Sequence, residues 1–443
     1  MAQRNVSAAN FSIADIDRAL ENPIPPSFIP DLTTFEDKFR KTSPVFEKLL
    51  FLKQEFYRSN SEVDAGFEER RRRHAEGHAP PGSYYRKGYE RLFQEFEEAN
   101  GGVFGQGKIQ CFLDMGCSPG GFSNWLLENN ENACGVGITL PYPQVAKHPL
   151  AVDGSHLKES RYHVQYLDIT RIVQDKLAQG QAPLIPVGSE GLNGTRPYDL
   201  IIAGAFSIGE GNRAWWERIH LVFSQMSIAL CNLSPEGDFI LVVNTKPFRW
   251  LIEVLRLLRL CFRTVSSHKG KELHAIRSSC YIICRGFIAP EADILAYIQS
   301  LSNVLAKLGR FVLQPPPNMI SSRDIEQSGL PVQLHLFPDL SDDILFQEER
   351  TFVLPLLERA WQHQFDVIRT DLVEKGSSTR HTSSAVYRPP QQRTIRSPSA
   401  ADTSNWRQTE RSYPSQPPAS GSRGSRYSFG NPGAADGRDS WRQ

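Results

Sequence analysis

The 443-residue sequence has few of the features that mark secreted, metal-binding or membrane proteins. Its seven cysteines are scattered and include no C-x-x-C pair, which favours reduced thiols inside a cell over a disulfide framework or a zinc site. No apolar run approaches the length of a membrane span, and the N-terminal residues lack the apolar core of a signal peptide. The formal net charge of +1 at pH 7 indicates no particular partner. We therefore expect an intracellular protein, cytoplasmic or nuclear, without a membrane span or a metal.

Residues 84–287 have the pattern of an α/β domain. Short apolar runs bounded by turn residues predict buried strands at 109–116, 133–140, 163–170, 198–205, 237–244 and 279–286. Between them, residues 121–130, 214–233 and 249–262 carry apolar residues at helical spacing. This alternation predicts a doubly wound, mostly parallel, Rossmann-like sheet, and we expect the last strand to lie at its closing edge.

The flanking segments differ in composition from this domain. Residues 1–83 combine short helical patterns with a charged stretch, in which Arg70 to Arg73 form a nuclear signal, an RNA-contacting patch or a solvated helix face. Residues 288–375 predict helices that pack on the domain. Residues 376–443 are rich in Ser, Arg, Pro and Gly and predict a disordered tail. Its arginines and aromatic residues suit contact with RNA, and the alternative is an inert solubilising tail.

The most specific signal is the stretch DMGCSPGGFSNWL at 114–126. An apolar run ends at Asp114 and enters a glycine-rich turn, which allows a ligand to approach the backbone closely. A P-loop requires Lys and Ser or Thr after its last glycine, whereas Phe122 follows here. The glycines at 116, 120 and 121 do not fit G-x-G-x-x-G, the turn that binds dinucleotides. Two interpretations of the turn remain: a binding site for S-adenosyl-L-methionine (SAM), or a plain glycine turn without a ligand.

This turn resembles the first motif of the FtsJ-like methyltransferases, the family of ribosomal RNA and mRNA-cap 2′-O-methyltransferases. The family form is D-L-G-x-x-P-G-G-[FW]-S, and weaker similarities follow at 135–141, 166–170, 198–206 and 268–287. The similarity covers less than half of the chain. It implies the Rossmann-like fold of SAM-dependent methyltransferases and, as partners, SAM and RNA.

The resemblance also assigns roles around the cofactor. The turn backbone would hold the methionine part of SAM, and Asp114 would order the turn or meet the ammonium group. Phe122 would form a wall of the site, and Asp168 would accept a hydrogen bond from the adenine amino group. Thr139 stands where an acidic residue usually holds the ribose. The implied cofactor-binding residues are Asp114, Gly116, Ser118, Pro119, Gly120, Gly121, Phe122, Thr139 and Asp168.

The catalytic positions depart from the family pattern. The family activates a ribose 2′-hydroxyl with a Lys-Asp-Lys-Glu tetrad, whose central lysine lowers the pKa of the hydroxyl. Gly204, Val242 and Ser279 stand at the positions of the aspartate, the second lysine and the glutamate. The catalytic part of the site is therefore either formed by other residues or lost.

Three basic residues are the candidates for a rebuilt site. The first tetrad lysine falls at Arg91, with Lys87 one helical turn earlier. Lys246 follows Val242 by four residues and, by alternation along a strand, is expected on the same face. The predicted catalytic residues are Lys246, Arg91 and Lys87. An arginine at the first position holds charge but cannot act as a base.

Three functions stay open at this point. The leading prediction is an active SAM-dependent methyltransferase that acts on RNA. The second is a catalytically silent relative that binds RNA or a protein. The third is a methyltransferase for another acceptor, such as a small molecule whose nucleophile needs no lysine. Retained SAM binding would count against the silent relative, and salt-sensitive RNA binding would separate the first function from the third.

Overall fold

A computed structural model of the chain describes residues 13–57, 82–141, 150–152, 154–158, 160–187, 196–206, 214–319 and 321–378. Arg70 to Arg73 and residues 379–443 lie outside these ranges, so the predictions made for them stay predictions. Residues 376–378, predicted to belong to the disordered tail, are helical instead. Within the described ranges, no helix is both long and apolar enough to cross a membrane. The same ranges contain no cluster of three or more His, Cys, Asp or Glu residues that could bind a metal ion.

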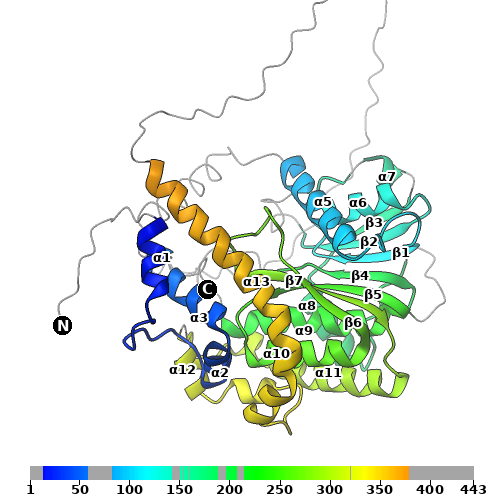
Figure 1. The fold of residues 1–443 in the computed structure, drawn as a ribbon. Coiled ribbons are helices and arrows are strands. Elements are labelled where there is room, and N and C mark those ends of the chain that lie inside the picture. Colours follow the sequence, from blue (N-terminus) through cyan, green and yellow to red (C-terminus); the bar gives the residue numbers. More distant parts are fainter. Residues whose placement is uncertain are drawn as a thin grey trace, which may run out of the picture.

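The centre of the molecule is a seven-stranded sheet in the order β3-β2-β1-β4-β5-β7-β6 (Figure 1). Strands β1 to β5 are parallel, and β7 runs antiparallel to both β5 and β6. The predicted mostly parallel, Rossmann-like sheet is therefore confirmed. The strands are β1 (Cys111–Met115), β2 (Cys134–Thr139), β3 (Tyr162–Tyr166), β4 (Tyr198–Ala203), β5 (Leu233–Asn244), β6 (Phe262–His268) and β7 (Ser279–Phe287).

Two strands differ from the sequence prediction. β6 was not predicted, and it forms the edge of the sheet, so that β7 lies one strand inside. Its side chains are mostly exposed or half-buried after Phe262, because an edge strand packs less than a central one. The strand predicted over 163–170 ends at Tyr166, because Asp168 caps the next helix.

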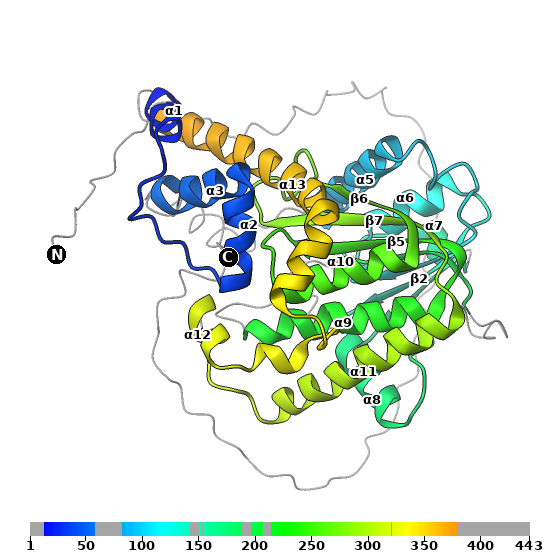
Figure 2. The same ribbon diagram turned by 60° about the horizontal axis from the view of Figure 1, so that its bottom comes forward.

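Helices cover both faces of the sheet (Figures 1 and 2). One face carries α5 (Gly82–Ala99), α6 (Gly121–Asn129) and α7 (Gly154–Lys158), and the other carries α8 (Ile169–Ala178), α9 (Trp215–Asn232), α10 (Arg249–Cys261) and α11 (Glu291–Leu313). Successive strand residues alternate between the two cores. Phe112 and Ile202 belong to the apolar cluster beneath α5 and α6, whereas Leu113 and Ile201 belong to the larger cluster of the opposite face.

The flanking helices pack beside the carboxyl ends of the parallel strands (Figure 1). They are α1 (Ile13–Glu21), α2 (Thr34–Thr42), α3 (Pro44–Phe51), the π-helix η1 (Leu52–Tyr57), α12 (Ser322–Gln327), the 3₁₀ helix η2 (Pro331–Leu334) and α13 (Asp342–Ser378). Helix α13 packs against α3, α10 and β6. Core residues of α1, α2 and α13 belong to the larger apolar cluster, so the flanks and the sheet share one core.

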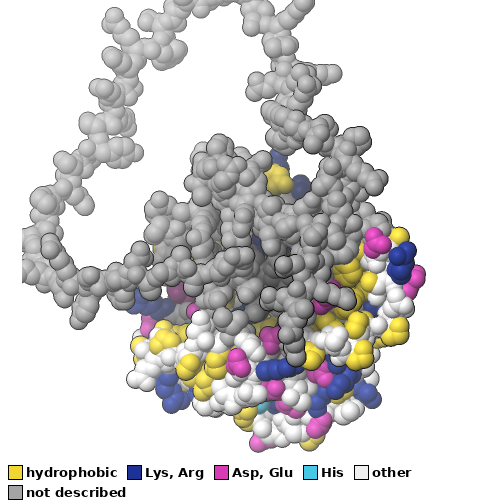
Figure 3. Space-filling view, turned by 90° about the vertical axis from the view of Figure 1, so that its left-hand side faces the viewer, with side chains coloured by type: hydrophobic (Ala, Val, Ile, Leu, Met, Phe, Trp, Pro, Cys, Tyr) yellow, Lys and Arg dark blue, Asp and Glu magenta, His cyan; other side chains and the backbone are white. Residues whose placement is uncertain are grey.

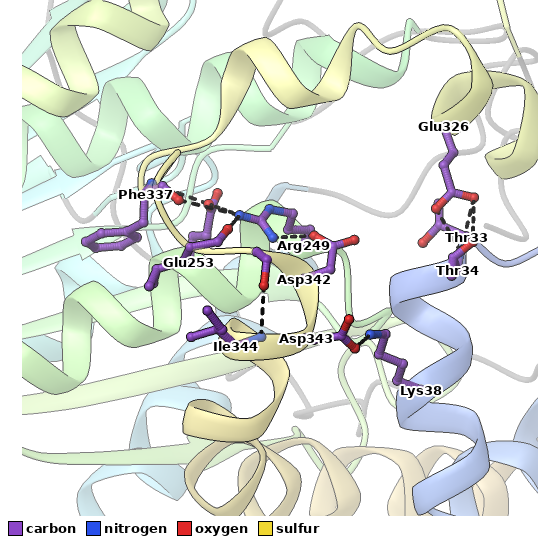
Figure 4. A network of polar contacts seen from close by, with 12 residues as sticks. Thr33, Thr34, Lys38, Arg249, Glu253, Glu326, Phe337, Asp342, Asp343 and Ile344 are labelled. Atoms are coloured by element: carbon purple, nitrogen blue, oxygen red, sulfur yellow. Dashed lines mark hydrogen bonds and ion pairs between the residues drawn. The ribbon is translucent and has the colours of Figure 1, made fainter.

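Polar contacts join the N-terminal flanking helices to the C-terminal ones (Figure 4). The Thr34 amide of α2 donates to Glu326 Oε1 of α12 at 2.9 Å, and Lys38 of the same helix forms an ion pair with Asp343 of α13. Figure 3 looks onto this side of the molecule, where positive and negative side chains of the described residues lie close together. The N-terminal helices are thus part of the folded body.

Candidate functional site

The turn after β1 depends on two glycines. Gly116 has φ 84° and Gly120 has φ 99°, which is the left-handed region that favours glycine. The amides of Gly116 and Cys117 donate to the carbonyl of Ile138 in β2 at 2.7 and 3.1 Å. A Cβ atom on Gly116 would lie 2.5 Å from the Cα of Ala205, just after β4. The turn therefore joins the carboxyl ends of three neighbouring strands.

The same turn opens helix α6. Gly120 is the N-cap and forms no side-chain cap, and the first turn contains no acidic residue. An N-terminus of this kind suits an anionic group such as a carboxylate. A Cβ atom on Gly120 would clash with Val152 Cγ2, and one on Gly121 would clash with the Arg86 carbonyl of α5. These glycines are thus required by close packing of the chain around the start of the helix.

Asp114 lies buried beneath the turn. The Ser123 hydroxyl donates to Asp114 Oδ2 at 2.7 Å and lies 2.7 Å from the Tyr162 hydroxyl. Burial raises the pKa of Asp114 to about 7, and the hydrogen bond from Ser123 opposes that rise. Because Ser123 belongs to the first turn of α6, the contact links the end of β1 to that helix.

The other predicted cofactor residues lie at the same edge of the sheet. The Thr139 carbonyl at the end of β2 accepts from the Leu167 amide at 2.8 Å. Asp168, just after β3, accepts from the Thr170 amide at 2.9 Å and is exposed. Phe122 is buried against Tyr89, with ring centroids 5.3 Å apart. Ser118, Pro119 and Gly121 complete the turn, so the structure brings the predicted set to the ends of β1, β2 and β3.

Lys246 does not lie on the expected face. β5 ends at Asn244, whose side chain accepts from the Lys246 amide at 2.7 Å, so the chain bends and the alternation of the strand stops. The ammonium lies 3.2 Å from Glu36 Oε2 of α2 and donates to the Ser322 hydroxyl at 2.7 Å. It also donates to the carbonyl of Asp31 at 3.1 Å. The prediction that Lys246 shares a face with Val242 is wrong.

The other two catalytic candidates lie on α5. Arg91 Nη2 is 3.4 Å from Glu272 Oε2, and these side chains are 61% and 78% exposed. Lys87 is exposed one turn earlier on the same helix. Nothing in these contacts assigns either residue a role, so both stay predictions.

Val242, at the position of the central tetrad lysine, lies on the α5 side of the sheet, near a Tyr–His pair. Val242 packs in the same apolar cluster as Tyr89 of α5 and Leu273 of the β6–β7 loop. The Tyr89 hydroxyl lies 3.5 Å from His274 Nε2, and the two ring centroids are 5.8 Å apart. Burial raises the pKa of Tyr89 to about 12. This pair could not be predicted from the sequence, because its two residues are 185 positions apart.

The fold and the turn define the class of this protein. A mostly parallel sheet in this order, with a glycine turn after its first strand and polar groups at the carboxyl ends of β1 to β3, is a Rossmann-like methyltransferase fold. Residues 91–287 match the FtsJ-like methyltransferase family. This match includes the motif at 114–126 that indicated the same family.

Curated relatives match the same part of the chain. The inactive cap-specific mRNA (nucleoside-2′-O-)-methyltransferase 1B of Caenorhabditis briggsae is 25% identical over 202 residues, which cover 44% of this chain and 23% of the relative. The cap-specific mRNA (nucleoside-2′-O-)-methyltransferase 1 of Caenorhabditis elegans is 26% identical over 203 residues, or 44% of this chain and 22% of the relative. The chain thus spans less than a quarter of the length of these relatives.

Solved structures show a more distant similarity. An O-methyltransferase family protein from Burkholderia thailandensis has a TM-score of 0.29 and 13% identity, over 47% of this chain and 60% of its own. Human methyltransferase-like protein 13 in complex with SAH has a TM-score of 0.25 and 15% identity, over 49% of this chain and 88% of its own.

Proposed function

We propose that the chain is a SAM-dependent methyltransferase that acts on RNA. The observation that carries this proposal is the turn at the end of β1, with left-handed Gly116 and Gly120 before an uncapped α6, in a domain of the FtsJ-like family. Both relatives carry the name of a cap-specific mRNA 2′-O-methyltransferase, one of them as inactive, and these names favour an RNA ribose hydroxyl as the acceptor. An RNA substrate is consistent with a cytoplasmic or nuclear protein.

The residues at the strand ends fit SAM. The N-terminus of α6 would hold the carboxylate, because its first turn has no side-chain cap. Asp168 would accept from the adenine amino group, and Thr139 would form one hydrogen bond with the ribose. Asp114 would order the turn through Ser123. SAM supplies a methyl group on a positively charged sulfur, which is a good leaving group, so the protein mainly has to align the acceptor.

The group that activates the acceptor is a separate question. Lys246, Arg91 and Lys87 are the candidates that follow from the family alignment. The ammonium of Lys246 is engaged by Glu36, and Arg91 pairs with Glu272. A catalytically silent protein that binds RNA is the second candidate function, because Gly204, Val242 and Ser279 carry no ionisable group. The relative named as inactive is consistent with that alternative.

Two measurements on the purified full chain test the proposal. Calorimetric titration with SAM should give saturable binding, and tritiated SAM should label capped or uncapped RNA transcripts. Binding without transfer to either transcript would contradict RNA as the acceptor and favour a methyltransferase for another acceptor. Absence of SAM binding would contradict the proposed cofactor site itself.

A further inference from the structure

We propose that His274 takes the proton from the acceptor hydroxyl during methyl transfer, in place of the family's lysine-centred tetrad. This role rests on the proposed function. The imidazole lies on the α5 side of the sheet, the side that Val242 faces from the position of the central tetrad lysine. Leu273, the residue before it, packs in one apolar cluster with Val242 and Tyr89.

Tyr89 connects His274 to the cofactor turn. A Cβ atom on Gly121 would clash with the Cβ of Tyr89, so this tyrosine lies directly over the start of α6. Its ring contacts Phe122 and its hydroxyl lies 3.5 Å from His274 Nε2. An acceptor hydroxyl placed against both side chains would donate to the imidazole and lie next to the turn proposed to hold SAM.

The loop that carries His274 is held in a defined shape. The buried Lys269 ammonium donates to the carbonyls of His274, Arg277 and Ser279 at 2.6, 2.5 and 2.7 Å. Burial lowers the pKa of Lys269 to about 8. His274 has φ 63°, a left-handed conformation that is uncommon for residues other than glycine. Strained conformations of this kind persist only where the surroundings impose them, and they concentrate at functional sites.

The proposed step is balanced in atoms and charge. The acceptor oxygen forms a bond to the methyl carbon, the carbon–sulfur bond of SAM breaks, and its electron pair stays on sulfur. The hydroxyl proton passes to a ring nitrogen of His274, and the resulting imidazolium later releases that proton to water. The step requires a neutral imidazole, because only the unprotonated ring can accept a proton.

Titratable and charged groups lie on the elements around this loop, and Tyr89 contacts the imidazole directly. Tyr85 and Tyr89 belong to α5, Lys269, Glu272 and Arg277 belong to the same loop, and Asp114 and Tyr281 belong to β1 and β7. Because a base must be unprotonated, we expect transfer to decline at acidic pH, where imidazoles gain a proton.

His274→Asn tests the inference, because asparagine adopts the left-handed conformation readily and removes the imidazole. With SAM saturating at every pH, so that the ionisation of Asp114 does not affect the rate, we expect kcat/KM for a capped transcript to fall at least about a hundredfold and the acid limb of the pH profile to disappear. The affinity for SAM and the melting temperature should match those of the parent. His268→Asn is the matched control, since His268 precedes the same loop but bonds to Glu95 at 3.0 Å; it should keep the pH profile of the parent.

The outcomes separate the inference from the proposed function. A His274→Asn enzyme that transfers methyl groups at the rate of the parent, or that keeps the acid limb, would overturn the role of His274 alone. A parent that binds SAM but labels no RNA would overturn the proposed function and this role with it. Should His274→Asn fail to fold, Tyr89→Phe keeps the ring and removes the hydroxyl. It should slow transfer about tenfold at unchanged SAM affinity, and an unchanged rate would contradict the inference.

Discussion

Lys246→Met should loosen the N-terminal helices from the sheet. The Lys246 ammonium lies 3.2 Å from Glu36, whose side chain is only 1% exposed, so its removal leaves a buried carboxylate without its cation. Removing one partner of a buried ion pair costs about 3–5 kcal/mol. For a folded body of this size, this cost lowers the melting temperature by about 4–6 °C.

The loss of stability in Lys246→Met should depend on pH, and it should be larger at high pH than at low pH. Burial raises the pKa of Glu36 above its ordinary value, while the charge of Lys246 opposes that rise. Without the lysine the pKa rises further, and the folded state binds the proton more tightly than the unfolded state. The loss of stability is therefore largest above this pKa, and it shrinks as the pH falls toward the ordinary glutamate value of about 4.3. Thermal unfolding at pH 5 and pH 8 measures the difference.

The double variant Glu36→Gln/Lys246→Met serves as the control for this reasoning. It removes both charges, and it should be more stable at pH 8 than Lys246→Met alone. A single variant that melts with the parent at pH 8, or a double variant no more stable than the single one, would refute the argument.

The methyl-transfer rates of Lys246→Met and of the single variant Glu36→Gln measure whether Lys246 also activates the acceptor. As an activating group, its loss should reduce methyl transfer at least about a hundredfold without changing SAM affinity. Glu36→Gln disturbs the same contact and leaves the amine in place. Equal transfer rates in Glu36→Gln and Lys246→Met would show that the lysine acts only by holding α2.

Three further outcomes are expected. Gly120→Val should abolish SAM binding by calorimetry, because its side chain would clash with Val152 and force a strained backbone, whereas Gly154→Ala, with open space around it, should bind as the parent does. SAM affinity should rise about tenfold from pH 6 to pH 8 as Asp114 ionises near pH 7, and Asp114→Asn should flatten this dependence. Deletion of residues 379–443, with ten arginines, should leave the melting temperature nearly unchanged, weaken RNA binding and flatten its dependence on salt.

The sequence predicted the parts of the fold whose signal is local. β1 and β4 are buried on both faces and appear as continuous apolar runs, and the glycine turn has a specific order of residues. The edge strand β6 was missed, since its mostly exposed or half-buried residues give no apolar run. The strand at 163–170 was drawn too long, because the capping role of Asp168 was not recognised.

The candidate site was predictable only in its cofactor half. The residues of the turn are neighbours in the sequence, so their order alone indicates their proximity. Lys246 contacts Glu36 of α2 and Ser322 of α12. Its amide donates to the side chain of Asn244, and this single contact turns Lys246 toward those helices. Tyr89 of α5 contacts His274 of the loop between β6 and β7, whose backbone accepts a hydrogen bond from Lys269. Contacts of this kind depend on tertiary packing, which cannot be predicted from the periodicity of apolar residues or from composition.

Analysis of RNA nucleotides after the reaction tests the central claim most directly. A capped transcript is incubated with the full chain and SAM, digested to nucleosides and examined by mass spectrometry for a methyl group on the ribose. Our account predicts a 2′-O-methylated nucleoside that requires both SAM and the chain and that is absent with Gly120→Val. Transcripts that stay unmethylated, under conditions in which the chain binds SAM, would contradict it.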